Sequence, residues 1–217
     1  METNQIGRSM VEMLGVLAII GVLSVGAIAG YSKAMNKYKM NKQVTQVSQI
    51  ISYIGYHHPL TKVSPRISII PMLKKLEVIP KEMIKDNDEN YIYDVFNNKI
   101  EILDGVVANW GAAPNKATTS VNFYANITKD NTAKQTCANL FGLIKEYHNS
   151  IWYVELVSTA NGSTVQVFAS FYGDKFCSED NCLKDLDVAK SIKFCSEAVE
   201  ETGRNLSYAY SIKFPEE

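Results

Sequence analysis

The four cysteines have the most distinctive chemistry in this chain: Cys137, Cys177, Cys182 and Cys195. All four lie in the C-terminal half, and their number is even, so two disulfides formed in an oxidising compartment are the economical interpretation. Free buried thiols are the alternative. Of the three possible pairings, Cys177 with Cys182 and Cys137 with Cys195 is favoured, because two cysteines close in sequence form a loop most readily.

The spacing of possible metal ligands does not match a zinc site, since there is one close cysteine pair and the histidines lie far from it in sequence. Two calcium sites are conceivable, at Asp86–Asn90 and at Glu179 with Asp180. The first has Tyr91 at the glycine position of a calcium loop and Asn97 at its bidentate-acid position. The chain has no G-x-S-x-G, H-E-x-x-H or phosphate-binding glycine loop. We therefore predict no enzyme, cofactor or metal site.

Glu12 is a carboxylate at the edge of an apolar run. Residues 13–32 are twenty consecutive uncharged residues, enough to cross a hydrocarbon core of ~30 Å. An unpaired carboxylate at the centre of such a helix costs ~2.5–3.5 kcal/mol, and less near the interface. A cut after Gly7 would place a new amino terminus at Arg8, one helical turn from Glu12, where neighbouring helices could pair ammonium with carboxylate. Alternatively, Glu12 extends to the lipid headgroups.

The helix is expected to continue past the membrane. Apolar residues recur at spacings of three and four over residues 33–56, and no proline occurs from Met10 to Tyr56. His57, His58 and Pro59 then end it. Gly26 and Gly30 have the spacing that permits close approach of helices in lipid, although glycine is also simply commoner in membrane helices.

Gly7, four intervening residues, Glu12 and an unbroken apolar helix resemble the prepilin signature of type IV pilins and secretion-system pseudopilins. The resemblance implies a leader at residues 1–7, removed by a prepilin peptidase that also methylates the new amino terminus in that family. It implies that Glu12 guides docking of subunits into a filament. The missing proline and the large C-terminal part lean toward the type IVb branch.

Residues 57–217 predict an α+β head with an antiparallel sheet and flanking helices. Helices are expected near 68–76, 130–147 and 187–201. Strands are expected on both sides of Asn97-Asn98, at 120–127, on both sides of Asn161-Gly162, and at 206–214. The predicted organisation is therefore a leader (1–7), a helix (8–56, spanning at 13–32 and amphipathic at 33–56) and the head.

The function expected from the resemblance is that of a structural subunit of a type IV pilus-like filament, a homo-oligomer. It would lie in the bacterial inner membrane with its head outside the cytoplasm before assembly, served by an assembly ATPase and a platform protein.

Charge counting alone would retain the lysines at 33–42 in the cytoplasm, but paired cysteines favour export. A net charge of −1 excludes a nucleic-acid coat. The alternatives are a minor pilin or pseudopilin, and a membrane-anchored exported enzyme or binding protein.

Overall fold

The computed structural model describes residues 6–57, 65–106, 117–125, 131–160, 163–178, 181–201 and 207–215. Contacts between Cα atoms divide the chain into two compact units, with the boundary between Lys39 and Met40. We call the part up to Lys39 the N-terminal unit and the part from Met40 onward the C-terminal unit. The predicted α+β class, with a long N-terminal helix and an antiparallel sheet with flanking helices, is confirmed.

Helix α1 extends without interruption over Ile6–His57 and so belongs to both units. Its sequence contains no proline, and the following sequence His58-Pro59 cannot continue a helix easily, because proline disfavours helical backbone in the residue before it. At the C-terminal end, the ring of His57 packs against Tyr53 and Tyr56, with ring centroids 4.5 and 4.9 Å away.

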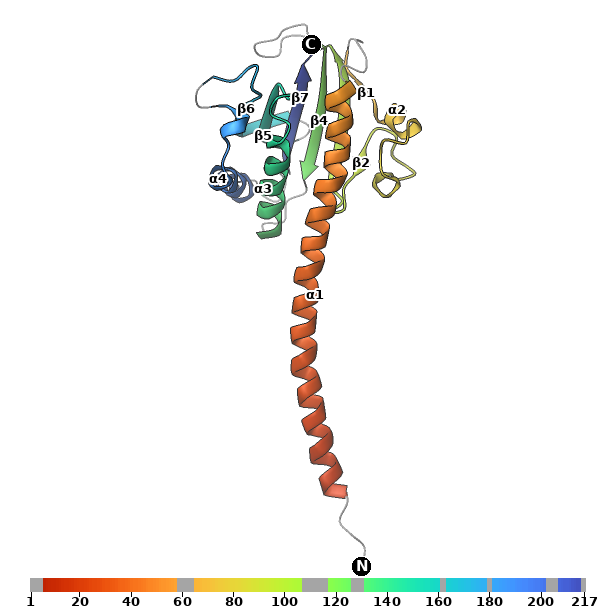
Figure 1. Ribbon diagram of the computed structural model, residues 1–217. Coiled ribbons are helices and arrows are strands. Elements are labelled where there is room, and N and C mark those ends of the chain that lie inside the picture. Colours follow the sequence, from red (N-terminus) through yellow and green to blue (C-terminus); the bar gives the residue numbers. More distant parts are fainter. Residues whose placement is uncertain are drawn as a thin grey trace, which may run out of the picture. The chain divides into compact units, whose positions relative to one another are not determined.

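Seven strands of the C-terminal unit form one antiparallel sheet in the order β1-β3-β4-β7-β5-β6, with β2 also paired to β3 (Figure 1). The strands are β1 Ile67–Ser68, β2 Ile92–Tyr93, β3 Lys99–Val106, β4 Ala117–Ala125, β5 Tyr153–Ala160, β6 Ser163–Tyr172 and β7 Ser207–Pro215. The last strand in sequence therefore lies in the middle of the sheet, between β4 and β5.

The turn between β2 and β3 forms where the Asn97-Asn98 signal predicts it. Asn97 has φ of 66°, a left-handed conformation that asparagine tolerates better than most residues. The Asp94 carboxylate accepts hydrogen bonds from the backbone N–H groups of Phe96 (2.9 Å) and Asn98 (2.8 Å) and so fixes the turn. The predicted hairpin of β5 and β6 is also present as paired strands, whereas its turn residues Asn161-Gly162 lie outside the described residues.

The shorter helices are α2 Ile70–Lys75, α3 Asn131–Lys145 and α4 Val188–Glu201, with 3-10 turns at Lys81–Met83 and Leu183–Asp185. Helix α4 begins where the sequence predicts, because the Asp187 carboxylate accepts a hydrogen bond from the backbone N–H of Lys190 at 2.6 Å. The two-residue strand β1 was not predicted, since a strand that short has no alternation to detect.

The core of the C-terminal unit lies against one face of the sheet. The strand register places Ile102, Val121, Val154 and Phe171 in one row across the sheet, and all four are buried. The ring of Phe171 packs against Phe141 of α3 and Phe194 of α4, with centroids 6.1 and 5.7 Å apart. The final turns of α1 complete this core through the fully buried residues Val47, Ile50, Ile51 and Ile54.

Candidate functional site

The N-terminal end of α1 carries the predicted processing and assembly residues. The backbone of Gly7 and Arg8 is helical, and Glu12 follows on the same helix with its side chain exposed. Arg8 and Glu12 are four positions apart, a rise of about 6 Å along a helix, so the two positions lie one above the other. No described side chain forms an ion pair with Glu12.

The apolar segment, Met13–Ser32, is exposed on all sides of the helix. Large apolar side chains from Met10 to Tyr31 are 52–76% exposed, and none of them belongs to the core. This part of α1 is long and apolar enough to cross a membrane. Burying a Leu, Ile or Val side chain contributes ~1.5–3 kcal/mol relative to leaving it in water, so the segment requires a covering of lipid or protein.

The glycines of the apolar segment have open space around them in the described part of the chain. A Cβ atom added at Gly15, Gly21, Gly26 or Gly30 would meet nothing within 4 Å. Each glycine nevertheless costs a helix in water about 1 kcal/mol relative to alanine. Gly26 and Gly30 therefore pack against no described residue, and their spacing is one that permits close approach of another helix.

From Met40 onward, the same helix is held by polar contacts as well as by the core. The side-chain Nε2 of Gln43 donates a hydrogen bond to Asp94 Oδ2, and Gln46 Oε1 accepts one from the backbone N–H of Val95 at 3.1 Å. Gln43, Gln46 and Asp94 are all buried. These bonds join the helix to the turn between β2 and β3.

The buried carboxyl of Asp94 is at the centre of this anchor. Its burial raises its pKa above the ordinary value, although hydrogen bonds from Gln43 and Asn98 act in the opposite direction. The Nδ2 of Asn98 contributes a further bond to Oδ2 at 2.9 Å. Gln43 Oε1, by contrast, is buried and has no described hydrogen-bond partner.

Two further contacts hold α1 from its other sides. The hydroxyl of Tyr147, just beyond α3, lies 2.9 and 2.7 Å from the hydroxyls of Ser48 and Ser52. Lys42 Nζ lies 3.5 Å from Glu82 Oε1. The pKa of Glu82 is lowered, chiefly by a hydrogen bond from its own backbone N–H and also by the charge of Lys42. Because Glu82 is exposed, this ion pair contributes little to stability.

All four cysteines are oxidised, in the pairing that the sequence favours. Cys137 of α3 is bonded to Cys195 of α4, and both residues are fully buried. Cys177 is bonded to Cys182 in the connection that follows β6. By loop entropy, the long-range bond stabilises the fold by ~4 kcal/mol and the short one by ~2 kcal/mol.

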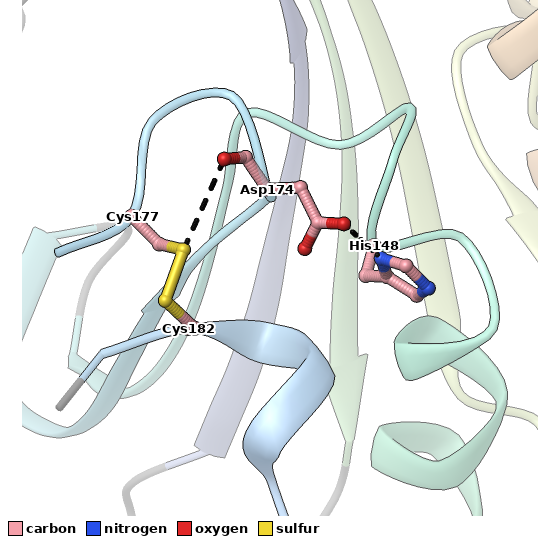
Figure 2. The surroundings of a disulfide bond; sticks show 4 residues. All are labelled: His148, Asp174, Cys177 and Cys182. Atoms are coloured by element: carbon pink, nitrogen blue, oxygen red, sulfur yellow. Dashed lines mark hydrogen bonds and ion pairs between the residues drawn. A yellow bond between two sulfur atoms is a disulfide. The ribbon is translucent and has the colours of Figure 1, made fainter. Parts of the chain in front are cut away.

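The short disulfide lies beside an acid and a histidine (Figure 2). His148 Nδ1 is 2.9 Å from Asp174 Oδ2, and both side chains are about one third exposed. Cys177 Sγ lies 4.0 Å from the Asp174 carbonyl oxygen, a contact without a hydrogen bond because a disulfide sulfur carries no proton. The backbone is tightly packed here: a Cβ at Gly173 would lie 1.7 Å from the Ile151 carbonyl oxygen.

The structure describes one of the two calcium candidates, the stretch Asp86–Asn90. Asp88, in the Asp86–Asn90 stretch, accepts a hydrogen bond from the Tyr93 hydroxyl at 2.5 Å, and its carbonyl oxygen accepts one from Lys74 Nζ at 2.6 Å. Glu179 and Asp180 lie outside the described residues. Within the described ranges, no three His, Cys, Asp or Glu side chains are grouped to hold a metal ion.

The polar anchor of α1 was not foreseen from the sequence. Gln43 and Gln46 lie on the same face as Ile50, and a polar residue on the apolar face of an amphipathic helix is a signal of a buried hydrogen bond. Asp94 had a weaker signal, an acid three residues before a predicted turn asparagine. Nothing in the sequence links these positions, which are about fifty residues apart.

Comparison of the chain with protein-family models, with curated proteins and with solved structures finds no match. Its function is therefore inferred from the residues and geometry described above.

Proposed function

We propose that this chain is a structural subunit of a type IV pilus-like filament, assembled through the N-terminal part of α1. The observation that carries the proposal is the apolar segment. It is exposed on all sides and preceded by Glu12, and it continues without a break into a helix anchored in a disulfide-bonded C-terminal unit. A filament core built from such segments would remove their apolar surface from water or lipid and give the glycines close neighbours.

Glu12 fits the proposal because assembly provides its partner. Removal of residues 1–7 creates an α-amino group at Arg8, and an α-amino group of pKa ~7.7–8.0 is largely cationic at neutral pH. When a subunit enters the filament, its Glu12 meets the ammonium of a neighbour, and both charges are neutralised in an apolar surrounding. A subunit in the wrong axial position leaves both charges unpaired, so this ion pair selects the axial position of each subunit.

Repetition of one such contact produces an open helical assembly. The apolar segment of one copy meets a different surface on the next, and a heterologous contact that does not close into a ring propagates as a filament. Both disulfides belong to the C-terminal unit, which supports a location outside the cytoplasm, with the apolar segment in the inner membrane before assembly. A prepilin peptidase, an assembly ATPase and a platform protein are the partners that this proposal requires.

The first test is the amino terminus of the protein extracted from its native host. Mass spectrometry of the intact chain should show a mature protein that begins at Arg8, with or without a methyl group. An unprocessed chain that retains Met1–Gly7 would contradict the proposal, because the ammonium that Glu12 requires would not exist.

The second test replaces Glu12 by glutamine, which removes the charge and keeps the shape. Sheared surface filaments should be lost while the membrane-bound precursor remains at its normal level. Glu77→Gln, at an exposed acid of the C-terminal unit, is the matched control and should assemble normally. A chain that serves only as a tethered exported protein would retain its localisation and function in both variants, and that result would refute the filament role.

A further inference from the structure

The C-terminal unit has an apolar groove bordered by α1, α3 and α4. Its volume is about 790 Å³. Its apolar lining comes from Val44 of α1, Ala138 and Gly142 of α3, and Val188 and Ile192 of α4, and polar side chains of all three helices border it. Val188 and Ile192 are 73% and 50% exposed, an unusual state for two neighbouring aliphatic side chains on one helix face.

A disulfide fixes the two helices that form one side of the groove. The Cys137–Cys195 bond joins α3 to α4 directly beneath it, one residue before Ala138 and one residue before Ser196. At the rim, Lys134 Nζ lies 2.7 Å from Glu200 Oε1. Because α3 and α4 cannot move apart or together freely, a ligand would find the groove already formed, and the entropic cost of binding would be small.

The shape and chemistry of the groove suit a helix. Lys134 is the one charged side chain among the described lining residues, and it is already paired. Ala138 and Gly142 are four residues apart, and a Cβ at Gly142 would meet nothing within 4 Å, so a second backbone can come close. One turn of a helix about 10 Å wide occupies ~400 Å³, which is less than the volume of the groove.

We infer that this groove receives the apolar segment, Met13–Ser32, of a second copy of the chain. This inference rests on the proposed function and adds the surface to which the apolar segment binds. The segment is uncharged and helical, exposed on all sides, and has its own small pair at Gly26 and Gly30. The segment lacks an apolar surface to cover it, and the groove lacks an apolar group to fill it.

Cross-linking in intact filaments tests the contact. A photo-activated phenylalanine analogue is placed at Ile192 in the full-length chain expressed in the native host, and cross-linked peptides are mapped by mass spectrometry. Lys193, exposed on α4 and outside the groove, is the matched control position. Cross-links from 192 to residues 13–32 of another copy, absent from 193, are the expected result. Cross-links from 192 to a C-terminal unit, to lipid, to another protein or to nothing would overturn the inference.

A second variant tests the groove without a probe. Gly142→Leu fills the recess, and the free space around Gly142 leaves the fold intact, which preserved protease resistance and disulfides would verify. Filament yield should fall at least about tenfold, while Lys193→Leu assembles normally. Normal filaments with Gly142→Leu would overturn the inference and leave the proposed function standing, whereas a wild-type chain that never forms filaments would refute the proposed function.

Discussion

Replacing Asp94 by alanine is expected to destabilise the C-terminal unit by about 3 to 5 kcal/mol. The Asp94 carboxylate accepts bonds from the backbone N–H groups of Phe96 and Asn98 and from the side-chain amides of Gln43 and Asn98. A buried donor without a partner costs about 1–3 kcal/mol. Several such donors would be left, and relief of the desolvated charge offsets part of their cost.

Asp94→Asn separates the hydrogen bonds from the charge. The new amide retains an oxygen for the two backbone donors. Once the Gln43 amide turns over, the new NH₂ group can donate to Gln43 Oε1, which has no described partner in the wild type. We expect a loss of about 1 kcal/mol or less, from the changed bond to Asn98. The assay is urea unfolding of the full chain in detergent, followed by tryptophan fluorescence, because Trp152 is buried.

The pH dependence of the free energy of unfolding gives a second test of the Asp94 carboxyl. Burial raises the pKa of Asp94 above its ordinary value of 3.8, so the folded state keeps this proton to a higher pH than the unfolded state does. The contribution of the carboxyl to stability is therefore largest below pH 3.8, and falls as the pH rises through the folded pKa. Wild type should gain stability relative to Asp94→Asn as the pH is lowered. Equal losses for the alanine and asparagine variants, or a gap that moves in the opposite direction, would refute the reasoning.

Three further changes test other parts of the fold in the same unfolding assay. Replacing Cys137 and Cys195 together by serine should lower the free energy of unfolding by about 4 kcal/mol, and a loss below ~1 kcal/mol would show that the bond constrains little. Gly173→Ala should lower the free energy of unfolding by about 3 kcal/mol or more, because the added methyl group would overlap the carbonyl oxygen of Ile151. An unchanged unfolding midpoint would contradict the close approach of Gly173 to that oxygen. Ile50→Ala should lower the free energy of unfolding by about 2–5 kcal/mol, whereas Gln49→Ala, at an exposed position, should lower it by less than ~0.5 kcal/mol. Equal effects would place Ile50 outside the core.

The sequence by itself determines the features of this protein that depend on near neighbours. An absence of proline and a periodic apolar pattern predict α1, Asp187 predicts the start of α4, and Asn97 predicts the turn between β2 and β3. The sequence also favours the observed pairing of the cysteines, because only three pairings are possible and one of them includes a short loop. Each of these signals lies within a few residues or follows from a count of alternatives.

Tertiary structure alone decides which distant segments meet. The position of β7 between β4 and β5 brings the last strand of the chain to the centre of the sheet, and no local pattern specifies that neighbour. The bond from Gln43 to Asp94 and the groove between α1, α3 and α4 arise in the same way. Strand periodicity determines which face of a strand is buried, but it does not determine which strand or helix packs there, because any apolar face can cover a buried strand face. Only simultaneous packing of all the elements selects one arrangement.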